Sequence, residues 1–294
     1  MKYAWITQHR GSFPVAVMCD VLNVSPSGYY DSIDRPPSLR AERHERIQQA
    51  VQQAHAESHG IYGSHKVAEV MQQRKDLESA CRNTVAAAMR ELGLKSRVCK
   101  RFKPTTTQTD PTKQPAENTL DRDFTADAPN RKWVTDITYL ATATGWVYLA
   151  VVVDLFSRKA VSWSIGASLA TELVSNALRQ AIERRRPDGK QLLHHSDRGC
   201  QYTSDAYQQT LKLLGITCSM SRRGNCYDNA VMERFFWSLK HEWTNHERFA
   251  NLEEARLSVF RYIETFYNSE RIHETLDYLS PNAYEAENAP AVAA

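Results

Sequence analysis

Three acidic residues in the second half of the chain lie inside patterns that are otherwise largely apolar. Asp136 interrupts the strand-like segment WVTDITYL, Asp197 ends the segment LLHHSD, and Glu233 lies in the helical pattern NAVMERFFWSLK. Burying a carboxylate costs free energy unless the group is paired or bound to a metal ion. Each acid taken singly can be an ordinary turn or surface residue. The set therefore predicts a site only if the fold brings all three together.

Carboxylate oxygens are hard ligands of the kind that Mg²⁺ and Mn²⁺ prefer. Two such ions about 3.5–4 Å apart can activate an attacking oxygen and stabilise the leaving oxygen of a phosphodiester. The reaction needs cations because the phosphoryl group is itself anionic. We therefore expect Asp136, Asp197 and Glu233 to be both the catalytic residues and the ligands of two Mg²⁺ ions, with Mn²⁺ as a substitute.

Helical spacing adds two candidates beside Glu233. Asn229 lies four residues before it and Lys240 seven residues after it, so all three share roughly one helix face. Lys240 can hold a DNA phosphate near the metal ions, and Asn229 can orient DNA or the carboxylate. The ordinary alternative for Lys240 is a surface lysine with a packed stem and a solvated ammonium.

Neighbouring residues leave alternatives open. Asp154 ends the second strand-like segment and can take the place of the first-strand ligand, and Asp228 can serve as a helix cap. We expect His194 and His195 to be structural or to face DNA rather than to bind metal. Three aromatic residues near the acids are expected to pack in the core rather than to stack on bases: Trp133, Tyr202 and Trp237.

The segments that carry the acids follow a strand-first pattern from residue 131 onward. Three strand-like segments precede alternating helices and strands, in the order β-β-β-α-β-α-β-α-α. This order predicts an α/β domain, and together with the three acids, which can converge at one sheet edge, it predicts a ribonuclease-H-like catalytic domain at 131–285. We expect a flexible tail at 286–294. The expected strands are 131–142, 145–157, 158–167, 192–197 and 216–221, and the expected helices are 171–186, 204–215, 228–243 and 252–268.

The front of the chain is helical. Residues 1–34 predict two short helices around the breaker NVSPSG, which fits a helix-turn-helix-like segment and equally a packed helix pair that binds no DNA. Residues 35–103 predict three further helices, so the catalytic domain is preceded by an all-α region. Residues 104–130 are rich in Pro, Thr, Asp and Asn, and we expect an exposed, protease-sensitive linker there.

A basic run closes the helical region. Residues 1–110 contain 16 Lys and Arg against 11 Asp and Glu, a net charge of +5, although the whole chain carries only +3. Such a run suits contact with DNA phosphates, and the alternative is a solvated helix end. Five cations in nine residues form the run: Lys95, Arg97, Lys100, Arg101 and Lys103.

Composition excludes several other classes of protein. The 294 residues are 42% hydrophobic, which allows a buried core and argues against general disorder. The sequence shows neither an apolar run long enough for a membrane helix nor a secretory signal at its start. The six cysteines form no Cys-x-x-Cys pair, so we expect free thiols in a reducing compartment and no structural zinc.

Four motifs in order resemble a known family. WVTDITYL, HHSDRGCQY, NCYDNAVMERFFWSLKHE and RIHETLDYLSPNAYE are similar to the second-reading-frame protein of the insertion-sequence-three family of bacterial DDE transposases. The front half, with FPVAVMCDVLNVSPSGYY and GIYGSHKV, also resembles that family, so the likeness covers nearly the whole chain. The 35 residues between Asp197 and Glu233 are themselves a mark of the family, whose catalytic core resembles that of retroviral integrases.

Carried over residue by residue, the resemblance implies a catalytic triad at Asp136, Asp197 and Glu233 and a basic residue two turns later at Lys240. It implies Mg²⁺-dependent cleavage at the ends of an insertion element, followed by strand transfer by a 3′-OH. A branched intermediate joined at one end and an excised circle are expected. The zinc module of retroviral integrases has no counterpart in this sequence.

We therefore expect an enzyme of DNA transposition, integration and recombination. Its partners would be double-stranded DNA, at the terminal inverted repeats and the target, and further copies of itself. The upstream helix-turn-helix and leucine-zipper segment of relatives is not seen in this sequence, so we also expect fusion or association with such a protein. The expected location is the bacterial cytoplasm, at the nucleoid. The alternatives are a ribonuclease-H-like nuclease that cuts without joining and a non-catalytic DNA-binding regulator.

Overall fold

The computed structural model describes residues 1–97, 115–222 and 225–288. The chain divides into two compact units. One comprises residues 1–57 and 67–94, and the other comprises residues 58–66 and 95–294. None of the described helices combines the length and the apolar character needed to cross a lipid bilayer.

The first unit is all helical. Its short N-terminal helices share a small core of Ile6, Met18, Cys19 and Tyr29. The predicted pair around NVSPSG is present as α2 and α3, and an additional helix, α1, precedes it. Because α3 contains neither Lys nor Arg, it lacks the cations that phosphate contact requires. The helices are α1 (Lys2–His9), α2 (Val15–Val21), α3 (Pro26–Asp34), α4 (Leu39–Glu57), α5 (Ser64–Gln73), whose first residues belong to the second unit, and α6 (Arg82–Glu91).

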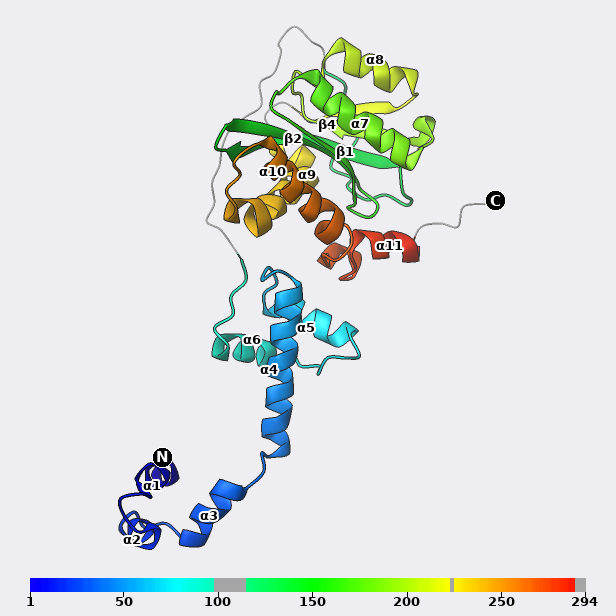
Figure 1. Cartoon of the computed structure of the whole chain (residues 1–294). Helices are drawn as coiled ribbons and strands as arrows, with labels where there is room; N and C mark the ends of the chain where they lie inside the picture. Colours follow the sequence, from blue (N-terminus) through cyan, green and yellow to red (C-terminus); the bar gives the residue numbers. More distant parts are fainter. Residues whose placement is uncertain (98–114, 223–224, 289–294) are drawn as a thin grey trace. The chain divides into compact units, whose positions relative to one another are not determined.

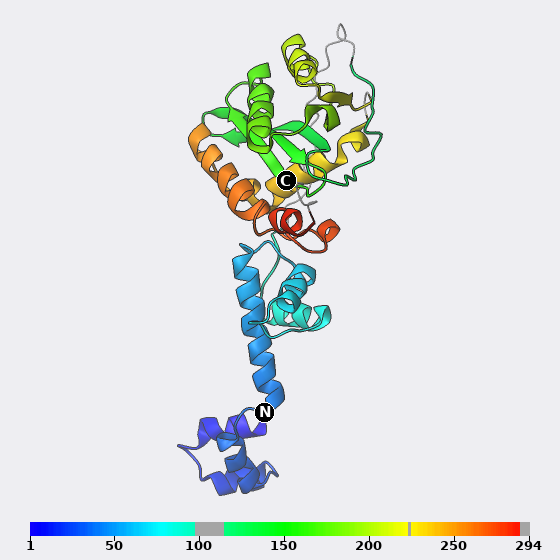
Figure 2. The same cartoon turned by 90° about the vertical axis from the view of Figure 1, so that its right-hand side faces the viewer.

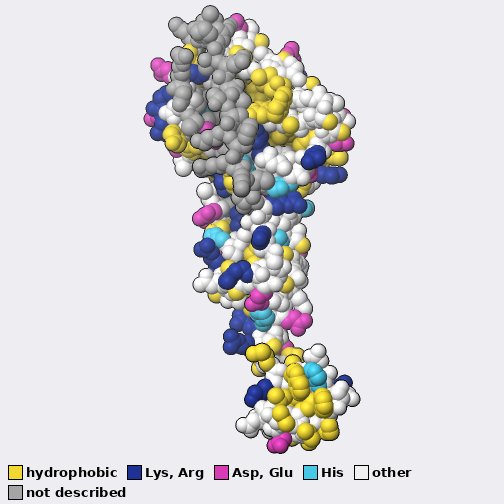
Figure 3. Space-filling model, turned by 90° about the vertical axis from the view of Figure 1, so that its left-hand side faces the viewer, with side chains coloured by type: hydrophobic (Ala, Val, Ile, Leu, Met, Phe, Trp, Pro, Cys, Tyr) yellow, Lys and Arg dark blue, Asp and Glu magenta, His cyan; other side chains and the backbone are white. Residues whose placement is uncertain are grey.

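The surface of α1–α3 is unusually apolar for so small a segment. Hydrophobic side chains gather there, at the lower end of Figure 3. The exposed residues include Phe13, Val17, Val21 and Tyr30, each more than half exposed. This surface and the charge of α3 favour helix packing, rather than DNA contact, as the function of the sequence pattern at 1–34.

The second unit is built on a mixed five-stranded sheet in the order β3-β2-β1-β4-β5. The first three strands form an antiparallel meander. β4 and β5 are parallel to β1. The strands are β1 (Lys132–Thr142), β2 (Gly145–Asp154), β3 (Ala160–Gly166), β4 (Leu193–Ser196) and β5 (Thr217–Met220). The sheet and its order of elements confirm the predicted ribonuclease-H-like architecture.

Helices cover both faces of this sheet. Figures 1 and 2 show α7 and α8 on one face and α9 and α10 on the other. Residues 149–153 of β2 are fully buried, as expected for an apolar strand that is covered on both sides. The helices are α7 (Thr171–Arg185), η1 (Gly189–Gln191), α8 (Asp205–Leu213), η2 (Cys226–Asn229), α9 (Ala230–Ser238), η3 (Leu239–Trp243), η4 (Thr244–His246), α10 (Leu252–Phe260), η5 (Arg261–Tyr267), η6 (Glu274–Leu276) and α11 (Pro281–Asn288).

Two long helices predicted from the sequence are interrupted. The helix expected at 228–243 begins as the 3-10 turn η2, continues as α9 and ends in the π-helical turn η3. The helix expected at 252–268 likewise changes from α10 into the π-helical turn η5. π turns inside helices are rare and often lie at functional sites. Lys240 lies in the first of them.

The predicted linker at 104–130 is wrong for its described part. Residues 115–130 pack on the rest of the second unit, although side chains such as Asp127 stay exposed. Leu120 is only 2% exposed, and its backbone N–H donates to Ser219 Oγ at 3.0 Å. Glu117 accepts a backbone hydrogen bond from Met220. A single buried leucine among polar residues does not alter the composition of the segment, which is why composition suggested a linker.

Residues 58–66 also belong to the second unit, although the sequence places them amid the helical region. The Tyr62 hydroxyl accepts from the Ile272 N–H at 2.9 Å. The Lys66 ammonium donates to the carbonyl of the same residue at 2.7 Å. His59 packs edge-on against Trp243 with ring centroids 5.1 Å apart. The predicted domain at 35–103 is therefore interrupted by a segment that is built into the catalytic unit.

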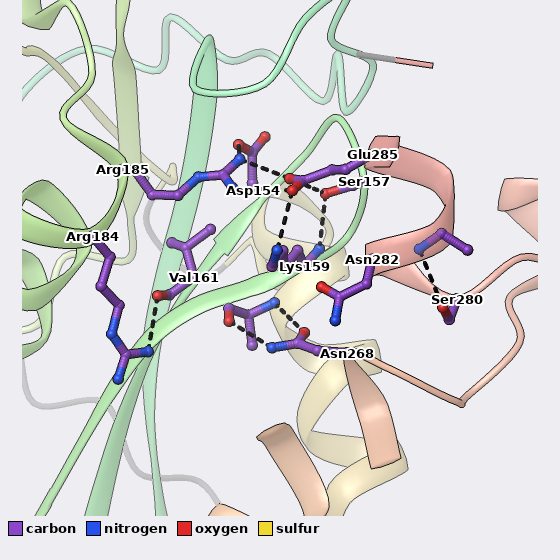
Figure 4. Close-up of polar contacts among 12 residues, drawn as sticks. Asp154, Ser157, Lys159, Val161, Arg184, Arg185, Asn268, Ser280, Asn282 and Glu285 are labelled. Carbon is purple, nitrogen blue, oxygen red and sulfur yellow. Dashed lines mark hydrogen bonds and ion pairs between the residues drawn. The ribbon is translucent and has the colours of Figure 1, made fainter. Parts of the chain in front are cut away.

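A buried ion-pair network fastens α11, which lies partly in the predicted tail, to the sheet (Figure 4). The Arg185 guanidinium donates to both carboxylate oxygens of Glu285, at 2.7 and 3.0 Å. Ser157 and Lys159 donate to the same carboxylate. Burial alone would raise the pKa of Glu285, but the hydrogen bonds and charges of Arg185 and Lys159 outweigh it and hold that pKa below its ordinary value.

Replacing Glu285 by Gln is expected to lower the free energy of unfolding by about 1–3 kcal/mol at neutral pH, because charge-assisted hydrogen bonds are lost. The stabilisation by a carboxylate with a depressed pKa is fully present above its unfolded-state value of about 4.3 and is lost as the pH falls through the folded-state value. The difference between wild type and Glu285→Gln should therefore shrink on acidification. Denaturant unfolding from neutral to acidic pH measures it, with exposed Glu287→Gln of the same helix as the control.

Candidate active site

Asp136 lies in the central part of β1, opposite Val151 of β2. On the other side of β1, the short strand β4 pairs only with residues 132–134. β1 therefore extends beyond the end of β4 before it reaches Asp136. The Asp136 carboxylate is half-buried and accepts from the Ile137 N–H at 2.7 Å.

Asp197 follows the last residue of β4, at the carboxyl end of that strand. Its Oδ1 accepts from the Gly199 N–H at 2.9 Å. A Cβ atom at position 199 would lie 3.0 Å from Asp197 Oδ1 and 3.1 Å from Gln201 Oε1. Glycine therefore allows the chain to turn closely around this carboxylate.

Glu233 lies in the first turn of α9, on its exposed side. The opposite side of α9 packs in the core through Met232 and Phe235. Just before the helix, Asn229 is buried and donates to the Thr135 carbonyl at 3.3 Å. This bond connects the start of α9 to the residue that precedes Asp136. Asn229 thus lies inside the protein rather than on the surface where we predicted DNA contact, and its position fits the alternative of orienting the carboxylates.

Electrostatics show that these acids lie near one another. Burial raises the pKa of Asp136 well above its ordinary value, and the negative charges of Asp197 and Glu233 raise it further. The Lys240 ammonium acts in the opposite direction. β1, the segment after β4 and α9 thus direct three carboxylates toward one region. Within the described ranges, no three His, Cys, Asp or Glu side chains already form a closed set of metal ligands.

Lys240 lies beside the acids and against an aromatic ring. Its ammonium is 4.4 Å from the ring centroid of Tyr139, a cation–π contact. Burial lowers the pKa of Lys240, whereas the charge of Asp136 raises it. The structure thus brings Lys240 next to the acids, although the π-helical turn changes the regular spacing from which that position was predicted.

The alternative residues have structural partners. Asp154 is fully buried and accepts from the backbone N–H groups of Asn130 and Phe156 at 2.7 and 3.0 Å. It pairs across the sheet with Trp133, three residues before Asp136 along β1. These contacts favour Asp136 as the ligand.

Both histidines are buried and satisfied by hydroxyl groups. His194 is 2.9 Å from the Tyr207 hydroxyl, and burial lowers its pKa to about 3. His195 contacts Ser219 and Ser221 at 2.8 and 3.0 Å, and burial lowers its pKa to about 4. These contacts fit the structural role that we expected for both side chains.

Of the three aromatic residues that we expected in the core, two are buried and one is not. Trp133 and Tyr202 are at most 1% exposed. Trp237 is half-buried instead, with the Arg234 guanidinium 4.6 Å from its ring. Trp237 therefore remains partly accessible on the helix that carries Glu233.

Sequence reasoning missed the central role of Asp228. Its carboxylate is fully buried and accepts from the Arg222 and Arg122 guanidinium groups at 2.8–2.9 Å. Asn118 donates to it as well, at 3.0 Å. The Arg222 hydrogen bonds hold the pKa of Asp228 well below its ordinary value. Instead of capping a helix, Asp228 connects residues 118–122 to the start of α9.

Part of the predicted basic run lies in the described chain. Lys95 and Arg97 are exposed, which is compatible with contact to DNA. The other three members of the run lie outside the described residues: Lys100, Arg101 and Lys103.

Models of protein families match most of the chain. An "integrase core domain" model matches residues 126–226, and a second model of that description matches residues 214–281. An "HTH-like domain" model matches residues 42–102. The HTH-like match therefore falls on α4–α6, and the helix-turn-helix-like interpretation of residues 1–34 stays a prediction.

Solved structures of viral integrases also match. A simian T-cell lymphotropic virus intasome in complex with the PP2A regulatory subunit B56 gamma is 17% identical, with a TM-score of 0.46, over 83% of this chain and 76% of that chain. The HTLV-2 integrase catalytic core domain in complex with magnesium is 19% identical, with a TM-score of 0.41, over 53% of this chain and 97% of that chain.

Bacterial relatives match over almost the full length. Transposase InsF for insertion sequence IS3A of Escherichia coli (strain K12) is 38% identical over 98% of this chain and 99% of its own length. The insertion element IS600 uncharacterized 31 kDa protein of Shigella sonnei is 38% identical over 91% of this chain and 97% of its own length. With an integrase core and an HTH-like domain in the same chain, the protein belongs to the IS3 family of transposases, enzymes that carry out DNA transposition.

Proposed function

We propose that Asp136, Asp197 and Glu233 are the catalytic acids of this transposase and that together they bind the divalent cations of the reaction. The observation that carries the proposal is the mutual effect of the three charges, because each added carboxylate raises the pKa of Asp136. Like charges are held together at a cost in free energy. A divalent cation among them removes that cost.

The donor atoms suit Mg²⁺, and Mn²⁺ would substitute for it. All three side chains offer hard oxygen ligands. Among the described residues, the buried Oδ1 of Asn229 has no hydrogen-bond partner, and a water of a hydrated cation would satisfy it. Glu233 is exposed on α9, so its side chain can turn toward the other acids when a cation binds. We propose two ions at this site.

When bound, the cations supply Lewis acidity to the attacking and the leaving oxygens of a phosphodiester. The chain's own residues place the substrate. In the first step water attacks the phosphodiester at the element end. The bond between phosphorus and the element's 3′-oxygen breaks, the phosphate stays on the flanking strand as a 5′-phosphate, and the element strand ends in a 3′-OH. In the second step that 3′-OH attacks a target phosphodiester in line, and the target strand's 3′-oxygen leaves. Lys240 would hold a phosphate of the transferred strand beside the acids.

Further DNA contacts would come from the basic run, through Lys95 and Arg97 and through the three cations that follow them. The natural substrates would be the terminal inverted repeats and the target duplex. Joining two element ends to one target requires more than one active site, so we propose a homo-oligomer assembled on DNA. Association or fusion with an upstream helix-turn-helix and zipper protein, and action at the nucleoid of the bacterial cytoplasm, complete the proposal.

Asp197→Asn is expected to abolish the joining of DNA strands because a cation ligand is lost. The assay follows cleavage and joining of labelled, nicked DNA from the element's end, with Mg²⁺ or Mn²⁺. The loss should exceed about a hundredfold, the upper range for removing a group that merely supports a metal ligand. Asp127→Asn, which changes an exposed acid, is the matched control and should retain activity.

Other results of this assay would favour the alternative functions. Cutting without a joined product would favour a ribonuclease-H-like nuclease. Intact DNA binding with neither product would favour a non-catalytic regulator, unless addition of the upstream protein restores joining.

Asp228→Asn is expected to reduce joining by about tenfold to a hundredfold, because Asp228 holds the start of the helix that carries Glu233. If Asp228 positions a cation ligand, the variant should need more Mg²⁺ for half-maximal activity. The backbone amides of Leu120 and Met220 should also exchange hydrogen faster, since residues 118–122 are released. Loss of global stability with an unchanged Mg²⁺ requirement would refute the positioning role.

A further inference from the structure

An exposed tryptophan lies at the end of the strand pair that carries Asp136. Trp146 is 55% exposed, whereas most of β2 beyond it is buried. It pairs with Ala141 of β1. The Thr142 hydroxyl donates to the Gly145 carbonyl at 2.7 Å across the connecting turn, and Gly145 has a φ of +125°. The turn therefore holds the indole at a defined place.

Tyr139 connects this indole to the active site. Its ring meets the Trp146 ring edge-on, with centroids 4.9 Å apart and planes at 85°. The same ring carries the Lys240 ammonium at 4.4 Å. Tyr139 lies three residues after Asp136, or about 10 Å along an extended strand. Asp136 and Tyr139 point to opposite faces of β1, and the Lys240 ammonium lies near both, against the Tyr139 ring and close enough to Asp136 for their charges to interact.

The order of these groups matches the order of groups in a DNA strand. Acids with cations act on one phosphodiester, an ammonium binds a neighbouring phosphate, and an aromatic face stacks on a base. Successive base pairs are about 3.4 Å apart, so Tyr139 lies about three base steps from Asp136. Frayed or unpaired bases near a cleaved end expose the faces that stacking requires.

We propose that Trp146, supported by Tyr139, stacks on a nucleobase of the DNA strand whose phosphodiester lies at Asp136, Asp197 and Glu233. The inference rests on the proposed function of those acids. Stacking depends neither on the phosphate charge nor on the hydrogen-bonding groups at the edge of a base. The contact should therefore tolerate many DNA sequences. The other occupant of such a surface would be a second copy of the chain, and the experiment separates the two.

The test measures DNA binding by the full-length protein without a catalytic metal. The probes are a fluorescein-labelled duplex of arbitrary sequence with a short single-stranded end and the same duplex with a blunt end. Trp146→Ala should weaken binding to the single-stranded end about tenfold, the loss expected for one stacked base. Trp146→Phe should bind nearly as wild type, because a phenyl ring also stacks. Phe260→Ala removes a comparably exposed ring on α10 (46% exposed) and should change nothing.

Salt dependence separates stacking from charge. Trp146→Ala should leave the dependence of affinity on salt unchanged, whereas Lys240→Gln should reduce its slope by about one released ion. Thermal unfolding of each variant confirms that the fold is retained. Photocrosslinking to a 5-iodouracil placed in the single-stranded end should join that base to Trp146.

Equal affinity of wild type and Trp146→Ala for both probes would overturn the inference. So would a change in sedimentation of the free protein with unchanged DNA affinity, since Trp146 would then contact a second copy. Either result leaves the catalytic proposal in place if wild type still joins strands and Asp197→Asn does not. Failure of wild type to join strands would instead refute the function on which the inference rests.

Discussion

The burial of Asp136 beside two further carboxylates is the constraint on which the rest of the second unit depends. Burial and two further carboxylates raise the pKa of Asp136, so holding its ionised carboxylate there costs the fold free energy. Three other acids of the same unit differ. Arginine partners outweigh burial at Asp228, Glu242 and Glu285 and lower the pKa of each. At Asp154 burial raises the pKa despite the charge of Arg185, so a raised pKa alone does not mark Asp136. What distinguishes Asp136 is that two further carboxylates add to the effect of burial.

Rigid elements hold Asp136 in place despite the free energy that its burial beside other carboxylates costs. Asp136 is fixed within the longest strand of the sheet, and β2 beside it is buried on both faces. The start of α9 is tied to that strand through Asn229 and to residues 118–122 through Asp228. Neutral backbone groups orient Asp136 and Asp197. These bonds fix the geometry without adding positive charge, so the region can still attract divalent cations.

The sequence was sufficient to predict the order of elements along the chain and the ribonuclease-H-like sheet, and local patterns also drew attention to the three acids that we propose as ligands. Alternating and continuous apolar runs predict strands, and a carboxylate inside such a run stands out because burying a charge costs free energy. Local patterns do not distinguish Asp136 from Asp154 as the candidate ligand, since both lie among apolar strand residues. The distinction depends on pairing register, which places Asp154 opposite Trp133 and within reach of Arg185.

Other features depend on contacts between distant parts of the chain. Arg122 and Asp228 are 106 positions apart, and no local pattern relates them. Residues 115–130 have the composition of a linker, yet one buried leucine and the hydrogen bonds to Asp228 hold them on the domain. Residues 58–66 are likewise held by distant contacts. The helical pattern on either side of them gives no sign of their hydrogen bonds to Ile272. Hydrophobic periodicity predicts which face of an element is buried, but it does not predict which other element covers that face.

The end of β4 has a consequence for the two chemical steps. Because β4 pairs with only three residues of β1, β1 continues past its neighbour, and Asp136 lies on the length of β1 beyond these pairs. Water and a DNA 3′-OH differ greatly in size, yet one site must accept each in turn as the nucleophile. An open edge admits both. Such an edge cannot by itself fix the strand under attack, and in our proposal Lys240 and the aromatic rings beyond it hold that strand.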